Sequence, residues 1–286
     1  MALKEAVEQR IDKANEENGS EEEMSFWDHL EVFRWTIFRI AIALVLLMVG
    51  CFIAMPHIFD SFVLGPTTSD FFIYKLLSGI GHGNGGALMP DFGNDYHVDI
   101  ININVATQFL THITTSFWFA LVLVFPYLIF ELWKFIRPAL YEKEKVGVRS
   151  AFIFGTVLFF IGCAVGYCVV FPITFRFLTQ YQVAETIANQ ISLNSYMTNF
   201  LTMVFIMGLV FEMPMLAWIL SKLGVLKKSF LKQYRRHAVV VLLVLAALIT
   251  PSGDPFTLSI VFLPLYLLYE VSILVVKDRE PEEEEI

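Results

Sequence analysis

Long apolar segments alternate with polar ones along the chain, and this pattern predicts membrane-spanning helices. The apolar segments cover about residues 35–55, 105–133, 150–171, 197–220, 238–250 and 259–276. The first four are long enough, at about 1.5 Å per residue, to cross a hydrocarbon core of about 30 Å. The segment 238–250 would reach only about 20 Å, and 259–276 is marginal. We therefore expect an all-α polytopic membrane protein with six transmembrane helices, of which the fifth and sixth are short.

Positive charge is concentrated on one side of this predicted bundle. Of the chain's 20 lysines and arginines, all except Lys75 and Arg176 lie near the N-terminus, in 134–149, in 222–236 or after the last apolar segment. Such an excess of positive charge is typical of cytoplasmic loops. We therefore expect both termini to be cytoplasmic. The segment at about 56–104 is then an external loop, broken by Pro56, Pro66 and Pro90.

Composition supports a membrane protein with polar ends. Hydrophobic residues make up 56% of the chain, which is more than in a typical soluble domain. The net charge of −8 comes largely from acidic residues near the two ends. Residues 1–24 and 278–286 are predicted to be disordered, acidic cytoplasmic tails around a membrane domain at 25–277. Because residues 1–24 contain no early apolar core, they are predicted to be neither a signal peptide nor a transit peptide.

The sequence contains no pattern that indicates a metal site, a cofactor or catalysis. The six histidines show no HExxH spacing, and the three cysteines lie inside apolar segments without CxxC spacing. The GxGxxG spacing of Gly81, Gly83 and Gly86 lacks the strand and helix of a dinucleotide site. We expect no metal, no cofactor, no nucleic-acid partner and no enzymatic activity.

One charge lies in the middle of the fourth apolar segment. The run Phe200–Leu220 contains only Glu212 as a charged residue, and Pro214 follows two positions later. A carboxylate at the bilayer centre costs about 2.5–3.5 kcal/mol on insertion scales, so it usually faces a bundle interior, a water-filled cavity or a partner. Pro214 cannot donate a hydrogen bond to the carbonyl of Val210, which weakens the same turn. Glu212 is therefore either a functional residue or a buried acid paired with a neighbouring helix.

A second candidate site lies in the predicted cytoplasmic loop at 131–144. It combines carboxylates with aromatic residues and a proline: Glu131, Glu142 and Glu144 with Trp133, Phe135, Pro138 and Tyr141. Carboxylates held at a membrane interface can bind guanidinium groups through charge-assisted hydrogen bonds. The alternative is a solvated loop whose glutamates pair with its own lysines, Lys134, Lys143 and Lys145.

The motifs over about 25–277 resemble the TatC family, the multispanning receptor subunits of the twin-arginine protein translocase. The first motifs are Phe26-x-x-His29-Leu30 with Arg34, and Leu132-Trp133-x-Phe135-Ile-x-Pro138-Ala-Leu140-Tyr141-x-x-Glu144. The later motifs are Gly162-x-x-x-Gly166-Tyr167, Gly208-x-x-Phe211-Glu212-x-Pro214, and Thr250-Pro251 through Asp254. Val32 stands where the family has its N-terminal glutamate, so Glu31 is the substitute, about 100° away on a helix.

The resemblance implies a concave, glove-like bundle in the bacterial inner (plasma) membrane, with export driven by the proton-motive force. It implies binding of the twin-arginine signal peptides of folded substrates, recruitment of the single-span TatA and TatB subunits, and self-association within the receptor complex. The implied signal-peptide residues are His29, Leu30, Glu31, Arg34, Phe135, Pro138, Leu140, Tyr141 and Glu144. The implied partner-binding residues are Phe211, Glu212, Pro214 and Asp254, and Pro66 matches a proline of an external loop.

An ion-coupled transporter of small solutes, with Glu212 as its proton site, is the alternative from a different functional class. Such carriers typically have internal inverted repeats and further intramembrane acids. The sequence shows no such repeat, and Glu212 is the one acid at the centre of an apolar segment. Export therefore remains the preferred prediction.

Overall fold

The computed structural model describes residues 26–80, 96–137, 142–184, 186–187, 189–250 and 252–276, and helices dominate these residues. The predicted tails at 1–24 and 278–286 and the glycines at 81–86 lie outside the described residues. The elements are α2 (Phe26–Ile58), η1 (Phe59–Val63), η2 (Gly65–Thr67), α3 (Phe72–Ile80), β1 (Ile100–Ile101), α4 (Thr107–Ile136), α5 (Glu142–Val165), η4 (Gly166–Val170), α6 (Phe171–Gln180), β2 (Ile191–Ser192), α7 (Leu193–Phe211), α8 (Met213–Lys222), α9 (Lys228–Gln233), α10 (Arg235–Ile249) and α11 (Pro255–Val275).

Five helical segments among the described residues are long and apolar enough to cross a membrane. They are Leu30–Thr67, Thr107–Ile136, Arg149–Gln180, Leu193–Lys222 and Pro255–Val275. The predicted segment at 238–250 falls in α10, which has 15 residues and reaches only about 22 Å. These helices give the architecture of a multi-pass membrane protein.

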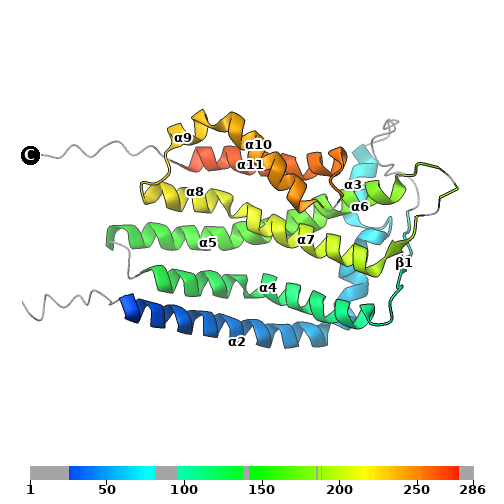
Figure 1. The fold of residues 1–286 in the computed structure, drawn as a ribbon, viewed down its shortest axis with the longest axis horizontal. Coiled ribbons are helices and arrows are strands. Elements are labelled where there is room, and N and C mark those ends of the chain that lie inside the picture. Colours follow the sequence, from blue (N-terminus) through cyan, green and yellow to red (C-terminus); the bar gives the residue numbers. More distant parts are fainter. Residues whose placement is uncertain are drawn as a thin grey trace, which may run out of the picture.

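The long helices lie alongside one another and define two ends of the bundle (Figure 1). At one end α2 begins, α4 ends, α8 ends and α11 ends. We call it the basic end, because Lys134, Arg137, Lys222 and Lys227 lie there. The two short strands and α3 lie at the opposite end, which we call the strand end (Figure 1).

The strands β1 and β2 set the relative placement of α4 and α7. They pair in parallel, with Ile100 opposite Ile191 and Ile101 opposite Ser192. β1 leads into α4 and β2 leads directly into α7. The pairing therefore starts α4 and α7 side by side and pointing in the same direction, and the two helices contact each other.

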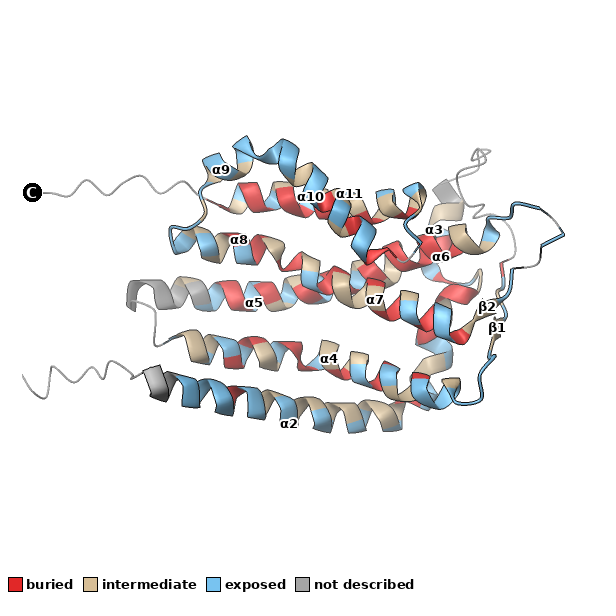
Figure 2. Cartoon of the chain, in the orientation of Figure 1, coloured by how far each residue is buried: buried red, intermediate tan, exposed pale blue. Residues whose placement is uncertain are grey.

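The buried core lies in the part of the bundle formed by α5, α6, α7 and α11, whereas α2 is largely exposed (Figure 2). In α7, Tyr196, Phe200, Met203 and Met207 are almost completely buried. α2 packs mainly along α4, and its apolar side chains, such as Leu46, remain exposed. Apolar side chains on the outside of the bundle suit contact with lipid.

Helices α5 and α7 approach each other closely at two glycines. A Cβ atom on Gly162 would lie 2.6 Å from the carbonyl oxygen of Met207. A Cβ atom on Gly208 would lie 2.6 Å from Sγ of Cys163. Since small residues let membrane helices approach through their backbones, these glycines are required for the observed separation.

The strand end contains a buried arginine held between two tyrosine rings. The guanidinium carbon of Arg176 lies 4.8 Å from the ring centroid of Tyr74 and 4.6 Å from that of Tyr96. The Tyr96 hydroxyl lies 2.7 Å from Oγ1 of Thr179. Burial raises the pKa of Tyr96 to about 12, although Thr179 and Arg176 act in the opposite direction, so the hydroxyl stays neutral at physiological pH.

The prediction of one external loop over 56–104 was wrong for part of this segment. Pro56 lies inside the last turn of α2, and α3 forms at 72–80. Pro66 is buried in η2, where its carbonyl accepts a hydrogen bond of 3.0 Å from the Tyr74 hydroxyl. Tertiary contacts of this kind order a segment whose prolines and polar residues alone indicate a loop.

Candidate functional site

The basic end brings the start of α2 next to the end of α4. Leu30, Glu31 and Arg34 lie on the first turns of α2 and are exposed. Nη2 of Arg34 lies 3.5 Å from Oε1 of Glu31, and both side chains are mostly exposed. An exposed pair of this kind contributes little to stability, so neither residue is committed to the other.

Phe135 connects this part of α2 to the loop motif at 132–144 identified in the sequence. It lies in the last turn of α4, and its ring centroid is 5.4 Å from that of Phe33 on α2. The structure thus places the first turns of α2, which carry Leu30, Glu31 and Arg34, beside the last turn of α4, which carries Phe135. Three predicted site residues, Pro138, Leu140 and Tyr141, lie outside the described residues. For His29 and Glu144 the backbone is described but the side chain is not.

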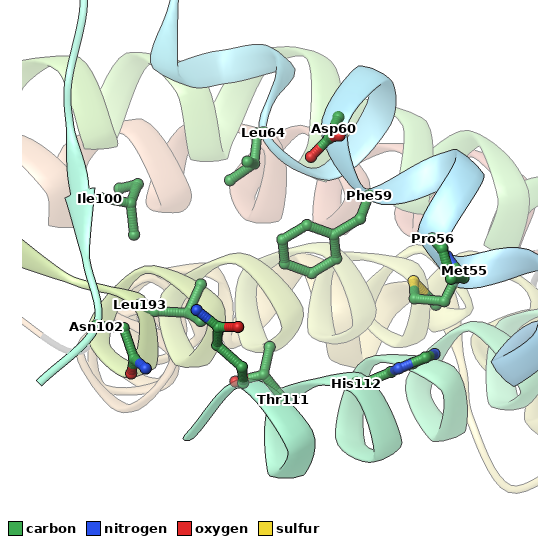
Figure 3. Close-up of a pocket in the computed structure, with 11 residues that line it drawn as sticks. Met55, Pro56, Phe59, Asp60, Leu64, Ile100, Asn102, Thr111, His112 and Leu193 are labelled. Carbon is green, nitrogen blue, oxygen red and sulfur yellow. The ribbon is translucent and has the colours of Figure 1, made fainter. Parts of the chain in front are cut away.

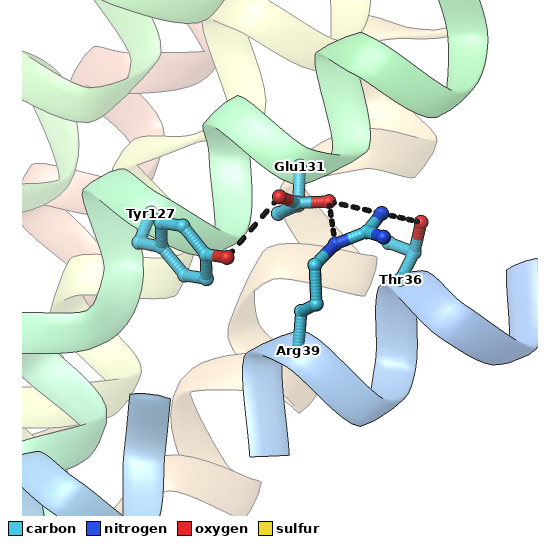
Figure 4. A network of polar contacts seen from close by, with 4 residues as sticks. All are labelled: Thr36, Arg39, Tyr127 and Glu131. Atoms are coloured by element: carbon cyan, nitrogen blue, oxygen red, sulfur yellow. Dashed lines mark hydrogen bonds and ion pairs between the residues drawn. The ribbon is translucent and has the colours of Figure 1, made fainter. Parts of the chain in front are cut away.

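A partly buried ion pair connects α2 to α4 just inside this region (Figure 4). Oε2 of Glu131 accepts hydrogen bonds from Nε and Nη2 of Arg39, at 3.0 and 2.8 Å. Oε1 of Glu131 accepts from the Tyr127 hydroxyl at 3.2 Å, and Nη2 of Arg39 also donates to Oγ1 of Thr36 at 3.1 Å. The Glu131 side chain is only 4% exposed. The pair is therefore part of the helix interface.

This ion pair corrects the prediction made for Glu131. The sequence places Glu131 in a cytoplasmic loop, either binding a guanidinium ligand or pairing with loop lysines. In the structure it lies inside α4 and pairs with Arg39, 92 positions away. The sequence could have predicted this pairing. Arg39 and Glu131 carry opposite charges inside two apolar segments, and charged residues inside a membrane usually pair with one another.

Glu212 lies at a break between α7, which ends at Phe211, and α8, which begins at Met213. Its N–H donates to the carbonyl of Leu209 at 3.1 Å, and Pro214 occupies the first turn of α8. The predicted weakening of this turn is therefore present as an interruption of the helix. Phe211 and Pro214 are both buried beside it.

The Glu212 carboxylate is buried among apolar groups against α5. Glu212 is 6% exposed, and no group among the described residues hydrogen-bonds either carboxylate oxygen. A Cβ atom on Gly155 of α5 would lie 2.7 Å from Oε2 of Glu212 and 2.8 Å from Cε of Met215. Glu212 therefore has no hydrogen-bond partner on a neighbouring helix among the described residues, which does not support the alternative of a paired acid.

Asp254 caps the N-terminus of α11 at the strand end. Its Oδ1 accepts from the N–H of Thr257 at 2.8 Å, and the Ser252 hydroxyl donates to Oδ2 at 2.6 Å. Partial burial raises the pKa of Asp254, but the hydrogen bonds from Ser252 and Thr257 lower it further, so the net pKa lies below the ordinary value. These contacts give Asp254 a structural role as a helix cap.

A cavity of about 400 Å³ lies at the strand end between the end of α2, β1 and the start of α4 (Figure 3). Its polar lining groups are Asp60, Asn102, Gln108, Thr111 and His112. Nε2 of His112 lies 2.8 Å from the carbonyl oxygen of Phe52. Among the described residues, no three His, Cys, Asp or Glu side chains gather in a way that could hold a metal ion.

Comparison with known proteins gives one consistent result. The family model described as Sec-independent protein translocase protein (TatC) matches residues 28–264. A Sec-independent protein translocase protein TatC of Blattabacterium sp. subsp. Periplaneta americana (strain BPLAN) is 31% identical over 261 residues, which are 91% of this chain and 96% of that protein. The protein of the same description from Helicobacter pylori (strain ATCC 700392 / 26695) is 36% identical over 190 residues, covering 66% and 74%.

Solved structures give the same result for the fold. The crystal structure of the twin arginine translocase receptor TatC in DDM superposes with a TM-score of 0.69 at 25% sequence identity. The match covers 87% of this chain and 99% of that one.

Proposed function

The chain belongs to the TatC family of Sec-independent protein translocase proteins, and from this membership we propose that it binds twin-arginine signal peptides at the basic end and recruits single-span partners at Glu212. The general role, protein transport by twin-arginine translocation, follows from the family. The residues that perform it in this chain are the content of the proposal.

In the proposed topology the basic end faces the cytoplasm of a bacterium, and α10 is the short fifth of six spans in a concave, glove-like bundle. Two observations support it. α2 begins and α11 ends at the same end of the bundle (Figure 1), as an even number of crossings requires. The lysines and arginines of the described loops also concentrate there, as they do in cytoplasmic loops.

The observation that carries the signal-peptide proposal is the joining of α2 to α4 at the basic end. The Phe33–Phe135 ring contact and the Arg39–Glu131 pair hold the exposed start of α2 beside the last turn of α4. The loop motif, with Glu144, continues from that turn. Glu31 of α2 and Glu144 of the loop motif would bind the two guanidinium groups by charge-assisted hydrogen bonds.

The test measures binding of a fluorescent twin-arginine signal peptide to the purified full-length chain. A charge-assisted hydrogen bond contributes about 1.5–3 kcal/mol, so Glu144→Lys should weaken binding by about 10- to 100-fold. Glu142→Lys is the matched control, with the same charge change two positions earlier, and should bind nearly as the unmodified chain does. A twin-lysine peptide should bind weakly to both. Unchanged affinity in Glu144→Lys would overturn the assignment.

The proposal for Glu212 rests on its buried carboxylate, which has no hydrogen-bond partner among the described residues. A partner helix with its own polar residue would supply a hydrogen bond that α5 and α7 do not. Glu212→Ala should therefore reduce co-purification of TatA and TatB and reduce export, whereas Glu212→Gln, which still hydrogen-bonds, should retain part of both. Normal recruitment and export by Glu212→Ala would return Glu212 to a packing role.

A further inference from the structure

A second cleft at the strand end, of about 410 Å³, lies between α4 and α7. Hydroxyl and amide side chains from both helices line much of it, including Thr111, Thr114 and Thr115 of α4 and Asn194, Thr198 and Thr202 of α7. None of the described side chains that line it carries a charge. We call it the threonine cleft.

The polar groups of the threonine cleft are arranged as facing stripes. Asn194, Thr198 and Thr202 are spaced four residues apart, which places them on one side of α7. The parallel pairing of β1 with β2 starts α4 and α7 side by side, so this stripe faces the threonines of α4. A lipid-facing surface would carry apolar side chains at these positions.

Thr115 is one of the residues that line the cleft. Its side chain is completely buried, and its hydroxyl has no hydrogen-bond partner among the described residues. The neighbouring Ser116 hydroxyl instead donates to the carbonyl of His112 at 2.7 Å. The other hydroxyl and amide groups that line the cleft therefore indicate a polar occupant. Such groups favour hydrogen-bond partners, and a lipid acyl chain can neither donate nor accept a hydrogen bond.

The cleft extends deep into the membrane span. Thr202 lies nine positions after Leu193, the first residue of α7, which corresponds to about 14 Å along the helix. A hydrocarbon core is about 30 Å thick. Both α4 and α7 belong to segments long and apolar enough to span the membrane. Because the segment Leu193–Lys222 has 30 residues, or about 45 Å, its ends extend beyond such a core. The cleft therefore enters the nonpolar layer from the strand end without crossing it.

We propose that the threonine cleft is filled with water that is continuous with the aqueous phase at the strand end. Its volume holds about a dozen water molecules at about 30 Å³ each, and its hydroxyl and amide groups give them hydrogen-bond partners. The nonpolar layer is therefore locally thinner beside α4 and α7. The cleft depends only on the packing of these helices, so this inference does not rest on the proposed signal-peptide site.

Cysteine accessibility tests the proposal in membranes. Cys51, Cys163 and Cys168 are first replaced by alanine, and single cysteines are then introduced in the full-length chain. A membrane-impermeant, positively charged methanethiosulfonate is added to the strand side. Because only the thiolate reacts and it requires water, Thr198→Cys and Thr202→Cys should react at rates within about tenfold of each other.

The matched control is Phe117→Cys. Phe117 lies at a similar depth on α4, ten positions after its first residue, is exposed, and does not line the cleft. It should react at least about 100-fold more slowly than Thr202→Cys, as a thiol in lipid does. Equal rates for Thr202→Cys and Phe117→Cys, or labelling of Thr202→Cys only from the basic side, would overturn the proposal. If Thr202→Cys does not fold, Thr114→Cys on the facing helix carries the same comparison.

Discussion

Gly162→Ala tests whether the close approach of α5 and α7 limits the stability of the bundle. The added Cβ would lie 2.6 Å from the carbonyl oxygen of Met207 and 2.7 Å from Cβ of Phe211, whereas ordinary contacts begin at 3.4 Å. Because the first neighbour is main chain, relief requires the helices to move apart by several tenths of an ångström. Overpacking of this kind costs about 1–3 kcal/mol, and replacing a helical glycine by alanine returns about 0.5–1 kcal/mol. We expect a net loss of about 1–2 kcal/mol.

Gly50→Ala on α2 is the matched control, because no atom lies within 4 Å of a Cβ atom built there. It should be neutral or more stable by up to about 1 kcal/mol. Both variants are unfolded reversibly in mixed detergent micelles, and the free energies of unfolding are compared. The two values should differ by about 2 kcal/mol. Equal stability of Gly162→Ala and Gly50→Ala would refute the argument that the missing side chain sets the helix separation.

Three further predictions concern polar contacts. Arg39→Met should lower the melting temperature in detergent more than Glu131→Gln does, because Arg39→Met leaves the buried Glu131 carboxylate without its cation. The double variant should recover most of this loss. Losses that simply add in the double variant would contradict the prediction. Asp254→Ala should cost about 1 kcal/mol at pH 7 by removing the helix cap. Because the folded-state pKa of Asp254 is depressed, this stabilisation is present above the unfolded-state pKa of about 3.9 and lost as pH falls through the folded value; Asp254→Asn should lack this pH dependence in unfolding titrations. Tyr74→Phe removes the hydroxyl that lies 3.0 Å from the Pro66 carbonyl and should cost about 1–3 kcal/mol in thermal unfolding; an unchanged melting temperature would show that the carbonyl finds another donor.

The positions of the long helices could be predicted from the sequence because lipid requires every backbone polar group to bond within its own helix. The break at Glu212 could be predicted for a related reason, since Pro214 removes one of those bonds. The positions of apolar residues and prolines are therefore enough to predict the structure where the bilayer requires backbone hydrogen bonds within a helix.

The remaining features depend on which helices are neighbours. Arg39 and Glu131 are both visible in the sequence, but their pairing requires α2 to lie along α4. Arg176 is visible as an isolated charge, but its place between Tyr74 and Tyr96 requires the fold of the strand end. The loop motif around Glu144 could be recognised from its residues alone, and its side-chain geometry remains a prediction.

The parallel pairing of β1 with β2 also constrains the order of assembly during synthesis. Chains emerge from the N-terminus and their units fold in that order, so α2 and α4 can associate as soon as both have been inserted. Ile100 cannot pair with Ile191 until the chain has crossed the membrane through α4 and returned through α5 and α6. Until then, Thr114 and Thr115 lack the side chains of α7 that line the threonine cleft with them. A nascent chain that stops before β2 should therefore expose a polar stripe to lipid, a signal that quality-control proteases of the membrane could recognise.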